Sequence, residues 1–127
     1  MSRAKRVLVV DDHEDAAEML GLLVGRLGFD VRTATDGKEA LAIANEFHPE
    51  IVIMDIGMPI MDGYETARQM RLQPWAGESC LVALTGWCSP NDLKLATEAG
   101  FDRHIAKPAG MAELKAMFKS VQDGQKA

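Results

Sequence analysis

Cysteine is scarce in this sequence, and its placement argues against a disulfide-stabilised fold. The 127 residues include two cysteines, Cys80 and Cys88. We predict a strand that begins at Cys80 and ends before Cys88, and strand residues advance by about 3.3 Å each. The two sulfur atoms would then lie roughly 15 Å or more apart, which is too far for a disulfide. We therefore expect two unbridged thiols, with Cys80 as a small core residue.

Long hydrophobic runs and an excess of positive charge are also absent. The apolar run Val7–Val10 is too short for a membrane span or for the core of a signal peptide. Fourteen Lys and Arg stand against nineteen Asp and Glu, which gives a formal net charge of −5. This balance disfavours non-specific attraction to nucleic acid or to an anionic membrane surface. We expect a cytoplasmic protein with neither of these as a partner.

The sequence contains no internal repeat, no low-complexity tract and no His/Cys spacing typical of zinc sites. Its length fits one domain of ordinary size, which would bury roughly two thirds of its unfolded surface. We expect a single domain over residues 1–127, with its core at about 5–122 and a polar tail at 123–127.

What the sequence does contain is a regular alternation. Short apolar runs rich in β-branched residues alternate with longer segments of helical period. The predicted strands are Arg6–Asp11, Asp30–Ala34, Ile51–Asp55, Cys80–Thr85 and Asp102–Ala106. Apolar strands separated by helices indicate a parallel sheet that is covered on both faces, with right-handed crossovers. The expected fold class is α/β, a doubly wound (βα)5 domain with a five-stranded parallel sheet.

The boundaries and faces of the helices support this alternation. Pro90 stands where a first helical residue belongs, and Gly28 and Gly100 stand where left-handed residues end helices. In the last helix one face is apolar, and in the first helix Leu22 falls on the side opposite the sheet, with Met19 at the margin. The residues of that last apolar face are Met111, Leu114, Met117, Phe118 and Val121.

Polar side chains follow the predicted strands where they end. The first strand ends on Asp11 and Asp12, the third on Asp55, the fourth on Thr85, and the fifth is followed by Lys107. Ligands bind outside the carboxyl ends of the strands in open α/β sheets. We therefore expect three acids, a hydroxyl and an ammonium at one edge of the sheet.

This set of groups indicates a site for a phosphoryl group. Crowded carboxylates need a cation, and hard oxygen ligands favour Mg²⁺. Lys107 would supply a second positive charge for phosphoryl oxygens. Taken singly, Asp12 could cap the first helix, Thr85 could be an ordinary strand residue, and Lys107 could be a solvated end. The second strand ends on Thr35 and Asp36, which are more simply helix caps.

Together these motifs resemble the receiver domain of bacterial two-component response regulators. The resemblance covers essentially the whole chain and rests on Asp11-Asp12, on Asp55 with Met58-Pro59 and Asp62-Gly63, on Thr85-Gly86, and on Lys107-Pro108. It implies a flavodoxin-like strand order of 2-1-3-4-5. It also implies a signalling domain and not a turnover enzyme.

The resemblance assigns a role to each residue of the set. Asp55 would be the phosphorylated nucleophile, with Asp12 as a direct Mg²⁺ ligand and Asp11 as a ligand through water. Gly57 would offer its backbone carbonyl to the metal, Thr85 and Lys107 would hold phosphoryl oxygens, and the Lys107-Pro108 bond would be cis. The donor would be a phosphohistidine on a histidine kinase or phosphotransfer domain, which in this family docks near the first helix. A downstream effector is a further possible partner.

One position departs from the commoner family pattern. The fifth strand usually carries Tyr or Phe where this sequence has His104, in the stretch GFDRHIAKP. We expect His104 to take the place of that aromatic residue in a switch that Thr85 drives. Similar GFD…H sequences resemble receivers attached to hybrid sensor kinases.

Other protein classes fit the residues less well. A haloacid-dehalogenase-type phosphatase would need a DxD arrangement at the first strand, where the two acids here are adjacent. A flavodoxin-type FMN binder would need a Ser/Thr/Gly-rich loop after that strand, where DDHED would repel phosphate. A scaffold that takes no phosphate is a third alternative, and the presence of the full set of site residues weighs against it.

Overall fold

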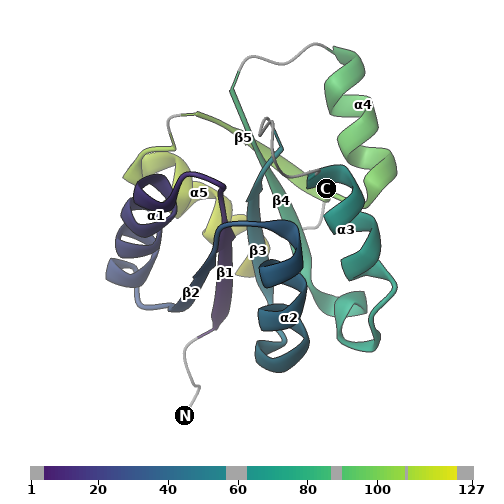
Figure 1. Ribbon diagram of the computed structural model, residues 1–127. Coiled ribbons are helices and arrows are strands. Elements are labelled where there is room, and N and C mark those ends of the chain that lie inside the picture. Colours follow the sequence, from purple (N-terminus) through teal and green to yellow (C-terminus); the bar gives the residue numbers. More distant parts are fainter. Residues whose placement is uncertain (1–4, 57–62, 87–89, 108, 123–127) are drawn as a thin grey trace.

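The computed structural model describes residues 5–56, 63–86, 90–107 and 109–122. Its centre is a parallel sheet of five strands in the order β2-β1-β3-β4-β5, as predicted (Figure 1). The strands are β1 (Arg6–Val10), β2 (Asp30–Ala34), β3 (Ile51–Asp55), β4 (Cys80–Thr85) and β5 (Arg103–Ala106).

Helices cover both faces of this sheet (Figure 1). They are α1 (Glu14–Arg26), α2 (Gly37–Phe47), α3 (Gly63–Arg71), α4 (Pro90–Ala99) and α5 (Met111–Gln122), with a 3-10 helix, η1 (Pro74–Glu78), before β4. One core layer joins the sheet to α1 and α5, and the other joins it to α2, α3 and α4. The alternation read from the sequence is therefore confirmed. Within the described segments no helix is long and apolar enough to cross a membrane.

The predicted strand bounds hold for β2, β3 and β4, and the other two strands are one residue shorter than predicted. β1 ends at Val10 and β5 begins at Arg103. Asp11 and Asp102 nevertheless continue the pairing, because their amides donate to Ala34 and Leu81 carbonyls. Every residue of β3 and β4 is buried, including Cys80, as expected for strands covered on both faces.

The helix boundaries follow the predicted signals where they are described. α4 begins at Pro90, and Gly28 and Gly100 have φ of 97° and 112°. Asp36 caps α2 by accepting a hydrogen bond of 2.7 Å from the Glu39 amide. Of the motif residues named above, Met58, Pro59 and Asp62 lie outside the described residues, as does Cys88.

The amphipathic faces also agree with the sequence pattern. In α5, Leu114, Met117 and Phe118 are buried on the sheet. On the outer side of α1, Met19 and Leu22 are 61% and 62% exposed. The predicted exposure of apolar side chains on the solvent side of α1 is therefore confirmed.

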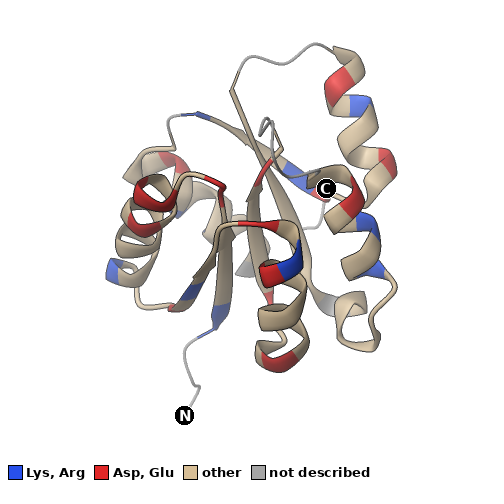
Figure 2. Ribbon diagram, viewed as in Figure 1, with Lys and Arg blue, Asp and Glu red and all other residues tan. Residues whose placement is uncertain are grey.

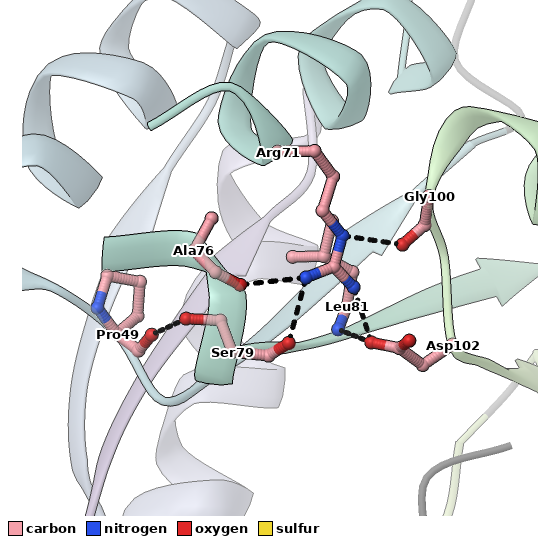
Figure 3. Close-up of polar contacts among 7 residues, drawn as sticks. All are labelled: Pro49, Arg71, Ala76, Ser79, Leu81, Gly100 and Asp102. Atoms are coloured by element: carbon pink, nitrogen blue, oxygen red, sulfur yellow. Dashed lines mark hydrogen bonds and ion pairs between the residues drawn. The ribbon is translucent and has the colours of Figure 1, made fainter. Parts of the chain in front are cut away.

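At the amino end of β4 and β5, Arg71 at the end of α3 contacts η1, the residue before β4 and the turn before β5 (Figure 3). Its guanidinium donates to the carbonyls of Gly100, Ala76 and Ser79 at 2.9, 2.9 and 3.0 Å, and to Asp102 Oδ2 at 2.5 Å. We call these contacts the Arg71 network. It fixes the end of α3 to η1 and to the turn between α4 and β5.

Two further bonds extend this cluster. Asp102 Oδ2 also accepts the Leu81 amide at 3.0 Å, and the buried Ser79 hydroxyl donates to the Pro49 carbonyl at 2.6 Å (Figure 3). Within the protein the Arg71 guanidinium thus donates four hydrogen bonds and Asp102 Oδ2 accepts two.

Candidate functional site

The parallel arrangement brings the predicted polar residues to the opposite, carboxyl edge of the sheet. Asp11 follows β1, Asp55 ends β3, Thr85 ends β4, and Lys107 follows β5. Acidic residues mark this edge at the β1–α1 connection and at the end of β3 (Figure 2). Asp11, Asp55 and Thr85 are buried, at 5%, 3% and 3% exposure, whereas Asp12 is half-buried. The strands β1, β3 and β4, which carry these groups, lie inside the sheet with a paired strand on each side.

Lys107 reaches across β4 to the end of β3. Its ammonium forms an ion pair with Asp55 Oδ2, and its backbone amide donates to the Thr85 carbonyl at 2.6 Å. The Asp55 side chain is 4% exposed and the Lys107 side chain 37% exposed. The ion pair therefore has one fixed, buried partner and one partner that solvent reaches.

Thr85 points its hydroxyl toward the edge strand. Thr85 Oγ1 donates to the Ile105 carbonyl at 3.3 Å, inside the protein. Ile105 belongs to β5, which also carries His104. A rotation of the Thr85 hydroxyl would therefore remove a hydrogen bond from β5.

The pKa of Asp11 reflects its burial and the concentration of negative charge at this edge. Burial raises the pKa of the Asp11 carboxyl, and the neighbouring charges of Asp55 and Asp12 raise that pKa further. The His13 amide, which donates to Asp11 Oδ1 at 2.9 Å, and the Lys107 ammonium act in the opposite direction. Burial and carboxylate repulsion outweigh these two stabilising contacts.

The donor set fits a hard divalent cation in its chemistry. Three carboxylates influence one another here, and Lys107 is the cation that compensates them in the described part of this edge. The excess negative charge and the all-oxygen donors suit Mg²⁺. As placed, the described residues form no group of three or more His, Cys, Asp or Glu side chains that could close around a metal ion. Gly57 lies outside the described residues.

Asp12 and His104 lie where the sequence pattern predicted, with one difference. The residue at the cap of α1 is His13, without a side-chain cap bond, so the simple role of Asp12 as that cap is not seen. His104 is exposed, Ile105 is buried and Ala106 is exposed, as strand alternation requires. Pro108 lies outside the described residues.

Beside the acidic edge lies a pocket that sequence reasoning missed. It has a volume of about 270 Å³ and opens between α1 and the segment after β5. Its lining residues are Asp11, Ala16, Met19, Leu20, Leu23, Leu84, Lys107 and Ala109. The exposed Met19 was a partial signal, but no linear pattern places Leu84 and Ala109 beside it.

Comparison with known proteins gives a consistent result. Residues 7–119 match the family described as response regulator receiver domain. The chain is 35% identical over 117 residues to the alkaline phosphatase synthesis transcriptional regulatory protein PhoP of Bacillus subtilis, covering 92% of this chain and 48% of the relative. It is 38% identical over 116 residues to the transcriptional regulatory protein PrrA of Mycobacterium tuberculosis, covering 91% and 49%. The chain thus spans about half the length of these curated relatives.

Solved structures agree. The chemotaxis response regulator CheY4 of Vibrio cholerae superposes with a TM-score of 0.85 at 30% identity, covering 93% of this chain and 98% of that one. The signal receiver domain of a signal transduction histidine kinase from Syntrophus aciditrophicus gives a TM-score of 0.82 at 30% identity, covering 95% and 92%. A chemotaxis response regulator and the receiver domain of a histidine kinase therefore both share this fold.

Proposed function

We propose that this chain, which belongs to the response regulator receiver domain family, accepts a phosphoryl group on Asp55 and thereby changes its partner binding. Members of this family are signalling domains and not turnover enzymes. We propose that residues 1–127 form a single receiver domain acting in the cytoplasm, with a histidine kinase or histidine phosphotransfer domain as donor. The observation that carries the proposal is the buried Asp55 carboxylate, paired with Lys107 and close enough to Asp11 to raise the pKa of that acid.

The transfer itself needs a carboxylate nucleophile in a fixed position. One oxygen of Asp55 forms a bond to phosphorus while the bond from phosphorus to the donor's imidazole nitrogen breaks, and the electron pair of that bond leaves with the nitrogen. Burial holds the Asp55 side chain in place, since it is 4% exposed. Asp11, Asp12 and Asp55, with the Gly57 carbonyl, would hold Mg²⁺, which when bound offsets negative charge on the phosphoryl oxygens.

Lys107 has a part before and after transfer. In this structure its ammonium neutralises Asp55. Once Asp55 carries a phosphoryl group, the same ammonium can pair with a phosphoryl oxygen, because its side chain is 37% exposed and has room to move. The Lys107 ammonium would therefore move from the Asp55 carboxylate to the phosphoryl group that this carboxylate carries.

Thr85 and β5 would carry the signal away from the site. When the Thr85 hydroxyl turns toward a phosphoryl oxygen, the Ile105 carbonyl loses the bond it accepts at 3.3 Å. This change favours a second arrangement of β5 and of the exposed His104. We assign the switch to Thr85 and His104 on this basis, with an effector that reads β5 as the possible downstream partner.

The donor domain would contact the face of α1 beside the site. Met19 lines the pocket next to Asp11 and Lys107, and Leu22 continues the exposed apolar surface on the same helix. Apolar side chains exposed next to a reaction site are suited to protein docking.

Intact mass measurement tests the proposed function. After incubation with acetyl phosphate and Mg²⁺, we expect the wild type to gain one phosphoryl group and Asp55→Asn to gain none, because the amide is not a competent nucleophile. Asp30→Asn, an exposed acid at the start of β2, is the matched control and should behave as the wild type. Equal uptake by Asp55→Asn would place the acceptor elsewhere.

A further inference from the structure

The first residue of α3, Gly63, packs against the backbone of the proposed phosphoacceptor. Gly63 is buried, and a Cβ atom at this position would lie 3.2 Å from the Asp55 carbonyl oxygen and 3.2 Å from Ile56 Cα. It would also lie 3.4 Å from Ile56 Cγ2. A side chain at position 63 would therefore press on the main chain at the end of β3.

Other glycines differ from Gly63 in what an added Cβ would meet. The close atoms at Gly21 and Gly100 belong to side chains, Thr33 Cγ2 at 3.1 Å and Arg71 Cγ at 2.7 Å. A Cβ at Gly25 or Gly77 would meet nothing within 4 Å. At Gly110 the nearest atom would be a carboxylate oxygen of Glu113, the far end of a flexible side chain. The neighbours of Gly63 include backbone atoms of Asp55 and Ile56, which cannot move away by a change of rotamer.

α3 has little freedom to withdraw from this contact. Gly63, Ala67 and Met70 lie on its buried face, at the spacing of a helix packed on a sheet. The Arg71 network fixes its far end, and the Tyr64 hydroxyl bonds to the Asp92 carbonyl at 3.3 Å near its start. The helix is held along its whole length.

The end of β3 is the side that yields more easily. Beyond Asp55 the pairing of β3 with β4 finishes with the bond from the Ile56 amide to the Leu84 carbonyl, which is long at 3.3 Å. A methyl group on residue 63 would move Asp55 and Ile56 by a few tenths of an ångström at this weak point. The carboxylate of Asp55 would move with its backbone.

We propose that Gly63 is a positioning residue for phosphoryl transfer: its missing side chain lets the first turn of α3 set the position from which Asp55 attacks phosphorus. This inference rests on the proposed function, because it concerns the geometry of the same carboxylate. Displacements of about 1 Å can cost on the order of a hundredfold in rate, so a shift of a few tenths of an ångström should cost on the order of tenfold.

The experiment compares phosphorylation rates of the wild type, Gly63→Ala and Gly25→Ala with acetyl phosphate over a range of Mg²⁺ concentrations. In Gly63→Ala the rate at saturating Mg²⁺ should fall on the order of tenfold. Gly25→Ala, in which the added methyl group meets nothing, should stay within about twofold of the wild type. Asp55→Asn gives the background, so a wild type at that background would defeat the proposed function and not this inference alone.

Two measurements separate positioning from a general loss of stability. Thermal unfolding establishes that each variant is folded at the assay temperature. The backbone amide resonance of Ile56 should shift in Gly63→Ala but not in Gly25→Ala, because only the first variant displaces the bond to Leu84.

A stabilised variant guards against the case in which Gly63→Ala alone fails to fold. Gly25 lies inside α1 and lacks a positive φ, so Gly25→Ala should raise stability through helix propensity. Gly63→Ala is therefore also measured in the Gly25→Ala chain, where the same loss of rate is expected. A rate within twofold of the parent in either background would overturn the inference. A chain that stays unfolded in both backgrounds would overturn it as well, because Gly63 would then be a requirement of the fold.

Discussion

The two ends of the sheet each carry an ion pair between an aspartate and a basic residue. The two pairs differ in the balance of charge around them. Arg71 and Asp102, at the amino end, lie 2.5 Å apart, and both make further bonds to backbone groups (Figure 3). Lys107 and Asp55, at the carboxyl end, share their surroundings with the acids Asp11 and Asp12. The Arg71–Asp102 pair has no net charge, whereas the site around Lys107 retains an excess of negative charge.

This difference distinguishes the Arg71 network, which has a structural part, from the candidate functional site at the carboxyl edge. A charge pair that balances its own charge and makes several bonds within the chain offers little to attract a ligand. A pair surrounded by further carboxylates is strained until a cation joins it. The amino end should therefore contribute to stability independently of Mg²⁺, whereas the contribution of the carboxyl end to stability should depend on Mg²⁺.

The largest effect on stability is expected from breaking the Arg71 network. Arg71→Met removes the cation from the Asp102 carboxylate and one donor from each of the three carbonyls that Arg71 contacts, and should lower the free energy of unfolding by about 3 kcal/mol. The loss, measured by urea unfolding, should be the same with and without Mg²⁺. Arg68→Met, on an exposed position of the same helix, should cost less than about 1 kcal/mol. A loss that Mg²⁺ reverses would contradict the separation of the two ends.

A smaller and metal-dependent effect is expected from Lys107→Met. This change leaves the buried Asp55 carboxylate without its cation, and should lower the unfolding free energy by about 1–2 kcal/mol in the absence of metal. Saturating Mg²⁺ should restore much of this loss, because the metal would compensate the same charge. Lys115→Met, an exposed lysine of α5, serves as the control. If Mg²⁺ stabilises both variants to the same extent, the metal does not replace Lys107.

The smallest effect is expected from Asp11→Asn, and it has the opposite sign. The pKa of Asp11 is raised above its ordinary value of 3.8, mainly by burial, so the folded protein binds this proton more tightly than the unfolded chain. Ionised Asp11 therefore destabilises the metal-free protein at neutral pH. Asp11→Asn should raise the unfolding midpoint by a few degrees at pH 7 without metal.

The pH dependence of this gain provides the check. The advantage of Asp11→Asn should shrink as pH falls through the raised pKa of Asp11, and vanish below the unfolded value of 3.8, where both states carry the proton. Differential scanning calorimetry across this range measures it. A midpoint for Asp11→Asn at or below that of the wild type at pH 7 would show that Asp11 is not strained.

The fold could be predicted because its signals are local. Ile51–Asp55 and Cys80–Thr85 are apolar runs that end on a polar residue, so their bounds were predicted correctly. Asp11 and Asp102 were assigned to strands although the strands stop one residue short of them. Both residues still donate a ladder-like amide bond, so the difference is one of definition at a strand end.

The contacts inside the site could be predicted only in part. The edge that gathers Asp11, Asp55, Thr85 and Lys107 follows from parallel pairing. The bond from Thr85 to Ile105, and the pairing of Lys107 with Asp55, depend on rotamers that no sequence spacing specifies. The Arg71 network was missed for a related reason, since its partners lie up to 31 residues away and show no periodic pattern.

The Arg71 network also determines how far a local event can spread. It fixes the turn after α4 and the amino ends of β4 and β5, while Thr85 and Lys107 lie at the opposite ends of the same two strands. Any displacement that starts at Thr85 must therefore be greatest at the carboxyl ends and decay to nearly zero at Asp102. A protein that distinguishes the two states of this domain would therefore have to contact β5 between His104 and Ala106, because Arg103 lies next to the fixed Asp102.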